Sequence, residues 1–164
     1  MTIRPIVRFP DARLQQKAET VTQFDEALKT LCNDLLETMR AASGIGITAP
    51  HIGVSSRVVV LELSPETGPK FYINPEIIEA SEEMIRHQEG SVSMSGMVDD
   101  VERHAKIRLR YQDLNGQEQF EESEGLLAVC HQHEVDQLNG IFWLQRLSRL
   151  KRDRLIKRYS KLNR

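Results

Sequence analysis

The chain has 164 residues, of which 40 % are hydrophobic and 28 % charged, a composition typical of a globular protein with a buried core. The net charge is only −2, no apolar run approaches the roughly 20 residues of a membrane-spanning helix, and the amino-terminal stretch lacks the apolar core of a secretion signal. The two cysteines, Cys32 and Cys130, form no CxxC pair and no disulfide framework. These features predict one domain over residues 1–164, reduced and cytoplasmic, with no membrane partner.

Apolar residues at steps of three and four predict a first amphipathic helix. They are Phe24, Leu28, Leu31, Leu35 and Met39, within residues 23–39. Thr22 or Asp25 could cap the start of this helix, and residues 43–46, SGIG, end it in a loop.

Strand patterns follow in the middle of the chain. Residues 56–63, SRVVVLEL, are rich in β-branched residues and predict a buried strand. Residues 71–77 are interrupted by Pro75 and are at best a short strand. Residues 107–111, IRLRY, predict a strand that returns through the turn 113–116, DLNG, to pair with residues 117–121.

Two helices are expected in the last third. The first runs from about Leu126 to Gln137 and stops at Asn139-Gly140. The second, at about 146–164, carries an apolar stripe of Leu147, Leu150, Leu155 and Tyr159. This tail has nine Lys and Arg and one acid, a formal charge of +8 that leaves −10 for the rest of the chain. The pattern suits contact with a polyanion such as RNA, or an ordinary solvated surface helix.

The segment 131–140, HQHEVDQLNG, raises the question of a metal site. In an HExxH helix, two histidines four apart lie on one face and bind one metal, while the Glu contacts the metal-bound water. His133 and Glu134 fit this pattern, but Gln137 stands at the second ligand position, and an amide is a poor ligand for such metals. Alone, the segment is more typical of a partly buried helix, and His131 lies in a polar run that we expect to be exposed.

Two further stretches bear on this question. Residues 44–53, GIGITAPHIG, combine closely spaced glycines with a proline, as in a loop whose backbone approaches a ligand or in a plain helix-to-strand loop. Residues 89–96, EGSVSMSG, form a small-residue strand or loop that has no nucleophile-and-base pattern of its own.

In this order, GIGITAPH, EGSVS and QHEVDQL resemble the motifs GxGLAAPQ, EGCLS and QHExDHL of the peptide deformylase family. The stretches IRPIVRFPDARL and FWLQRLSRLKRDRL resemble the ends of that family, so the resemblance covers nearly the whole chain. It implies an α+β fold with small antiparallel or mixed sheets around a central HExx(H/Q) helix, followed by a C-terminal helix. It also implies bacterial enzymes that remove the formyl group from N-terminal formyl-methionine with one divalent metal, Fe²⁺, Zn²⁺ or Ni²⁺.

Carried over by motif, the three metal ligands of the family fall on Ser91, His133 and Gln137, so only His133 keeps its ligand type. Glu134 keeps the position of the acid/base that handles the proton of the metal-bound water. The Gln that stabilises the oxyanion is replaced by His51.

The resemblance also implies a substrate groove. It places Ile45, Gly46 and Val92 along the peptide, with the backbone amide of Val92 as a second oxyanion donor. Val98 stands where the family often has an arginine that helps hold the peptide.

One imidazole, one hydroxyl and one amide bring no ligand charge, whereas tight sites use several imidazoles and thiolates. The sequence therefore predicts no tightly bound metal, and formyl hydrolysis that is lost or strongly weakened. One alternative is an active metal-dependent amidohydrolase with a rearranged site, in which His51 and His133 bind the metal. Another is a non-catalytic module that binds an N-terminal peptide, or the ribosome through its basic helix, since some deformylases use a C-terminal helix in that way.

Overall fold

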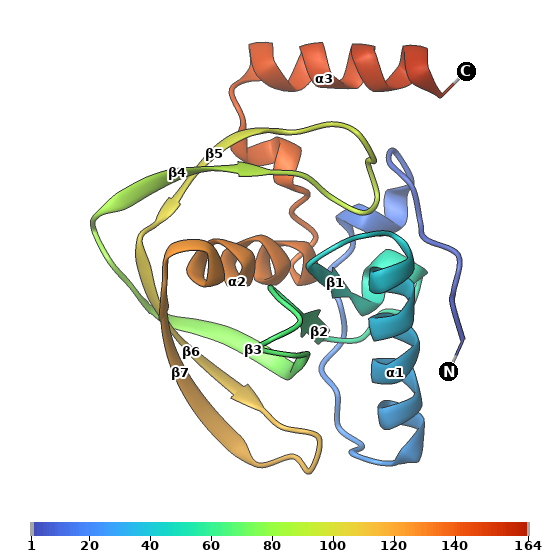
Figure 1. Ribbon diagram of the computed structural model, residues 1–164, viewed down its shortest axis with the longest axis vertical. Coiled ribbons are helices and arrows are strands. Elements are labelled where there is room, and N and C mark those ends of the chain that lie inside the picture. The colour runs from blue at the N-terminus through green and yellow to red at the C-terminus, as the bar shows by residue number, and fades with distance from the viewer. Residues whose placement is uncertain (1, 164) are drawn as a thin grey trace.

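The structure is a computed structural model that describes residues 2–163 (Figure 1). Within that range the α-helices are α1 (Glu26–Ala41), α2 (Gly125–Leu138) and α3 (Arg149–Leu162), and the short 3-10 turns are η1 (Ala12–Gln15), η2 (Ala49–Ile52) and η3 (Trp143–Arg146). One sheet has the order β1 (Gly46–Thr48), β2 (Val58–Leu61), β3 (Lys70–Ala80), β6 (Lys106–Gln112) and β7 (Glu118–Glu124). A separate hairpin joins β4 (Met84–Glu89) to β5 (Asp99–His104). All of these strand pairs are antiparallel.

Helix α2 lies at the centre of the fold. It contacts strands of the large sheet and of the β4–β5 hairpin, and Figure 1 shows it between the two. Every residue from 128 to 135 is buried, as expected for a helix that is covered on all sides. The α+β fold with a central motif-bearing helix and a C-terminal helix is therefore confirmed.

The first helix forms as its pattern predicts. The side chain of Asp25 accepts a hydrogen bond from the Leu28 amide at 3.1 Å, which caps the helix and favours Asp25 over Thr22 as the capping residue. Leu28, Leu35 and Met39 are buried against β1, β2 and η2 in one apolar cluster.

The expectation of at most a short strand at residues 71–77 is wrong, because β3 spans Lys70–Ala80. Its pairing with β6 shifts register between Ile73 and Glu76, so Pro75 lies at an irregularity where the ladder does not need its missing N–H. Asn74 has a positive φ of 52° there, and its side chain bonds both the amide and the carbonyl of Val21.

The β4–β5 hairpin was not predicted. The apolar–polar alternation along β4 is weak, because two of its three less exposed positions are the polar His87 and Glu89. Residues 90–98 connect the two strands, so the stretch 89–96 is mainly a hairpin connection rather than a strand.

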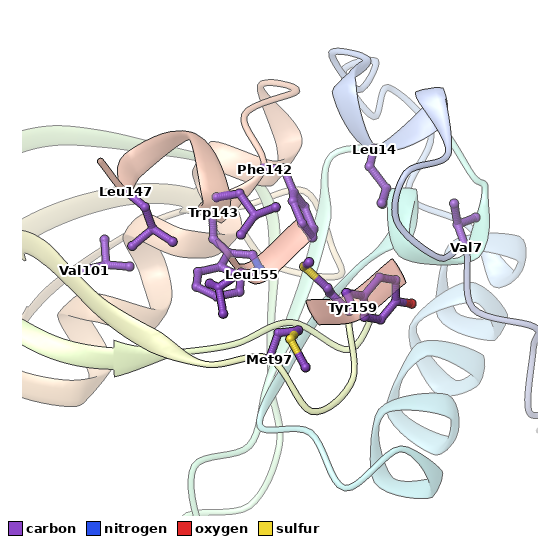
Figure 2. Close-up of a cluster of buried hydrophobic side chains, with 11 residues drawn as sticks. Val7, Leu14, Met97, Val101, Phe142, Trp143, Leu147, Leu155 and Tyr159 are labelled. Atoms are coloured by element: carbon purple, nitrogen blue, oxygen red, sulfur yellow. The ribbon is translucent and has the colours of Figure 1, made fainter. Parts of the chain in front are cut away.

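The basic C-terminal helix packs on an apolar cluster that contains the N-terminal segment, the β4–β5 connection and η3 (Figure 2). The cluster consists of Val7, Leu14, Met94, Met97, Val101, Phe142, Trp143, Leu144, Leu147, Leu155 and Tyr159. The predicted stripe is confirmed except for Leu150, whose side chain is 61 % exposed. Arg164, the last residue of the predicted tail, lies outside the described residues. Among those residues, we find no helix with the length and apolarity to cross a bilayer.

Candidate functional site

A cleft of about 360 Å³ brings the three motifs together. Its lining includes the loop before β1, from Ala42 to Gly46, the hairpin connection from Glu89 to Val92, and His133 and Glu134 of α2. These segments are far apart in the chain, and the antiparallel pairing of β1 with β2 and of β4 with β5 carries two of them to the side of α2.

His133 is buried between two carboxylates. Its Nδ1 lies 2.7 Å from Glu89 Oε1, and its Nε2 lies 3.4 Å from Glu134 Oε1. Burial lowers the pKa of His133, but the hydrogen bond that it donates to Glu89 and the charges of Glu134 and Glu89 outweigh burial, so its pKa is raised. The two carboxylates flank opposite edges of the ring and do not converge on one point.

Glu89 belongs to a chain of ion pairs that begins at the buried Arg103 and continues away from the cleft to the partly exposed Asp136 and Arg146. Arg103 donates to both oxygens of Glu89 at 2.7 and 2.8 Å and to Asp136 at 2.6 Å. Asp136 also accepts from Arg146 at 2.8 and 2.9 Å. Burial raises the pKa of Glu89, but the bonds from Arg103 and His133 prevail and lower it to about 2. Glu89 therefore remains ionised and orients His133.

Glu134 is buried at the cleft wall. Burial raises its pKa to about 7 in spite of the opposing charge of His133. Its Oε2 has no hydrogen-bond partner among the residues described. A Cβ added at Gly46 would meet Leu61 Cδ2 at 2.9 Å and the Glu134 carboxyl carbon at 3.4 Å, so glycine allows the backbone of β1 to approach this carboxylate.

His51 is buried and uncharged. The pKa of His51 is lowered to about 3, mainly by burial and secondly by the charge of His133. Its Nδ1 accepts the Thr48 amide at 2.9 Å, so the proton of the neutral ring is on Nε2. Within residues 2–163, that Nε2–H donor has no acceptor.

The two other positions carried over as ligands behave differently from His133. Ser91 lines the cleft, and its hydroxyl accepts the Ser93 amide at 3.1 Å. Gln137 is buried outside the cleft lining, and its amide donates to the Leu14 carbonyl at 2.7 Å. Among the described residues, no group of three or more His, Cys, Asp or Glu side chains is arranged to hold a metal ion.

The remaining predicted groove residues, Ile45 and Val92, line the cleft together with Val98. Sequence reasoning missed Glu89 and Arg103, although Glu89 directly precedes the glycine of the second motif. The expectation that His131 is exposed is wrong, because it is 2 % exposed and its Nε2 lies 2.6 Å from Glu121 Oε2 on the sheet side of α2.

Comparison with known proteins identifies the family of this chain. The family model described as polypeptide deformylase matches residues 3–153. The chain belongs to the polypeptide deformylase family. Among relatives in this family, a "peptide deformylase-like" protein of Brucella melitensis is 74 % identical over 164 residues, with full coverage of both chains. A "peptide deformylase" of Phenylobacterium zucineum is 43 % identical, over 98 % of this chain and 97 % of its own.

Solved deformylase structures have the same fold. The peptide deformylase of Legionella pneumophila superposes with a TM-score of 0.93 at 38 % identity, over 99 % of this chain and 96 % of its own. The Ehrlichia chaffeensis enzyme in complex with actinonin gives a TM-score of 0.94 at 37 % identity, over 100 % of this chain and 99 % of its own.

Proposed function

We propose that this protein is a deformylase-family member whose removal of the formyl group from N-terminal formyl-methionine is lost or strongly weakened, and whose cleft still binds an N-terminal peptide. The observation that carries the proposal is the hydrogen bond from Gln137 to Leu14, which directs one carried-over ligand position away from the cleft. Ser91 offers a neutral hydroxyl, so His133 is the one strong donor left of the three positions.

A divalent metal therefore does not fit the family's three positions in this chain. His133 alone has the arrangement of a ligand, because Glu89 can hold a proton on Nδ1 and leave the Nε2 lone pair free when the ring is neutral. One such donor is far from the several ligands of a tight site.

The alternative is an active enzyme that uses His51 and His133 as ligands. A metal needs a nitrogen lone pair, and on His51 the unpartnered nitrogen carries the proton. Binding through Nε2 would shift that proton to Nδ1, which would break the hydrogen bond from the Thr48 amide and leave the Thr48 hydroxyl, 2.9 Å away, as the acceptor for Nδ1–H. This cost argues against the rearranged site.

Metal stoichiometry tests the proposal directly. The protein is loaded with Fe²⁺, Ni²⁺ or Zn²⁺ under argon, desalted and assayed by elemental analysis. We expect well below one ion per chain in the wild type, and about one ion per chain in a Ser91→Cys/Gln137→His double variant that restores both ligands. About one ion per wild-type chain, lost in His133→Ala, would instead support the rearranged enzyme, and formyl-Met peptide hydrolysis would then be assayed.

A second candidate function is contact with the ribosome through α3. The observation that favours it is the exposed face of this helix, where Arg154, Lys157, Arg158 and Lys161 lie opposite the buried Leu155 and Tyr159. Binding of this kind would not depend on a metal and would be strongly salt-dependent.

A further inference from the structure

Strand β7 lies at one edge of the five-stranded sheet. It pairs with β6 on one side, and among the residues that the structure describes no backbone group outside β6 and α2 bonds to residues 119–123. Figure 1 shows β7 at the border of the molecule, far from the basic helix α3. Unpaired N–H and C=O groups along such an edge are a template on which an extended segment of another chain pairs.

Side chains on β7 alternate between the two faces of the sheet. Glu121 faces α2, where its Oε2 lies 2.6 Å from His131 Nε2, and the less exposed residues of β7 share that face. The other face carries three exposed glutamates and an aromatic ring that is 52 % exposed. We call these four residues the acidic edge: Glu118, Phe120, Glu122 and Glu124.

The cations of β6 leave much of this negative charge accessible. Lys106 Nζ lies 3.4 Å from Glu124 Oε2, and Arg110 Nε lies 4.0 Å from Glu118 Oε1. The two glutamate side chains are nevertheless 73 and 58 % exposed, and ion pairs that are so exposed are weak. Glu122 forms no ion pair with any residue that the structure describes. A strand added beside β7 would therefore meet carboxylates that can accept further cations.

The charge of the acidic edge decides which kind of strand fits. Antiparallel pairing of two copies about Phe120 or Glu121 would bring glutamates of the two chains opposite one another, and like charges directly opposite destabilise a strand pair. A cationic strand would instead gain an attractive pair at each of these positions. The edge therefore disfavours a second copy of this chain and favours a basic partner.

We infer that the acidic edge binds, by strand addition, an extended segment of another protein in which lysines or arginines alternate with other residues. In an antiparallel partner, every second residue lies opposite Glu124, Glu122, Phe120 and Glu118 in turn. The matching order from the amino terminus is cation, cation, apolar residue and cation. A parallel partner needs the reverse order. This interaction is independent of the cleft and of the proposed function.

Titration of isotope-labelled protein with short peptides, followed by NMR, tests the inference. The peptides have blocked ends and the sequences Lys-Thr-Lys-Thr-Val-Thr-Lys and its reverse. A control of the same composition, Lys-Lys-Lys-Thr-Val-Thr-Thr, has consecutive cations that point to both faces of a strand. We expect one of the two ordered peptides to shift the amide signals of residues 118–124 and to bind about tenfold more tightly than the control.

Backbone pairing is tested with two versions of the ordered peptide that binds, N-methylated at its odd or at its even positions. Only one edge of the added strand faces β7, so one version should lose binding and the other should keep it. Equal binding of both versions, or binding of the ordered and control peptides with equal affinity, would overturn the inference. Binding of none of the peptides would overturn it as well.

The role of the glutamates is tested with the triple variant Glu118→Gln, Glu122→Gln and Glu124→Gln. Its matched control neutralises three exposed glutamates outside β7: Glu66, Glu83 and Glu102. We expect the β7 variant to bind the ordered peptide about tenfold more weakly and the control variant to match wild type. Equal loss in both variants would assign binding to net charge, and a wild-type dimer that the peptide does not dissociate would assign the edge to a second copy. Either result would overturn the inference.

Discussion

At the scale of single residues, the side chains at two of the three carried-over ligand positions make hydrogen bonds to the backbone. Gln137 ties α2 to the N-terminal segment through the Leu14 carbonyl, and Ser91 accepts an amide of its own loop. A buried carbonyl needs a hydrogen-bond donor. Replacing Gln137 with histidine would remove the donor to the Leu14 carbonyl. Glu134, in contrast, keeps a buried oxygen without a hydrogen-bond partner among the described residues. Its raised pKa should make the stability of the protein depend on pH.

Glu134 should make the protein less stable as the pH rises. Its folded pKa of about 7 lies above the ordinary value of 4.5, so between these two pH values the folded state binds more protons than the unfolded state. The free energy of unfolding therefore falls as the pH rises through this window, by roughly 3 kcal/mol in total. Urea unfolding at pH 5, 6, 7 and 8 would measure the fall.

The variant Glu134→Gln should flatten most of this dependence, because an amide does not titrate. His133 acts in the same direction, since its raised pKa also stabilises the fold at low pH, so a residual slope is expected. Glu122→Gln, at an exposed position of β7, serves as the control for the loss of one carboxylate. An identical slope in Glu134→Gln and wild type would contradict the raised pKa.

At the scale of elements, the ion pairs of Arg103 join β4, β5 and α2, and Arg146 of η3 adds to them through Asp136. We expect Arg103→Met to destabilise the protein by about 3–5 kcal/mol, because it leaves the buried Glu89 without the guanidinium that bonds both of its oxygens. Arg110→Met removes an exposed pair with Glu76 and should cost at most about 1 kcal/mol. Denaturant unfolding of both variants measures the difference, and similar losses would show that the buried network contributes little.

The sequence predicted those elements whose signal is local. The α1 stripe, the β6–β7 hairpin with its DLNG turn and the helix ending at Asn139-Gly140 each have a pattern complete within one segment. The full length of β3 was missed because Pro75 is tolerated only at the register shift with β6, which depends on another strand. The β4–β5 hairpin was missed because polar residues occupy both faces of β4, so its sequence alternates little between apolar and polar residues.

In the candidate site, too, the residues within a local motif were predicted and their distant partners were not. The motif resemblance located His51, Ser91, His133 and Glu134, and all four line one cleft. The partners of these residues did not follow from the sequence, since Glu89 meets Arg103 only after the hairpin has formed and Gln137 meets Leu14 across 123 positions. The burial of His131 likewise depends on β7 lying against α2.

At the scale of the whole molecule, charge is divided between an acidic body and a basic helix. Figure 1 shows α3 at the periphery, beyond the β4–β5 hairpin, where its outer face is accessible to a large partner. The helix packs on the cluster of Figure 2 through Leu155 and Tyr159, so charge changes on the outer face should not disturb its packing. Charge-reversal variants on the outer face of α3 can therefore test ribosome contact without unfolding the protein.

If α3 contacts ribosomal RNA, wild-type protein should co-sediment with ribosomes at low salt and be released as salt is added. Three phosphate contacts predict that affinity falls roughly 20- to 40-fold between 50 and 200 mM salt. The triple reversal Arg154→Glu, Lys157→Glu and Arg158→Glu should abolish co-sedimentation, whereas reversing the exposed Arg8, Lys17 and Lys29 outside α3 should weaken it far less. Equal loss in both triple variants would mean that net charge alone is responsible, and unchanged binding in the α3 variant would exclude this helix as the contact.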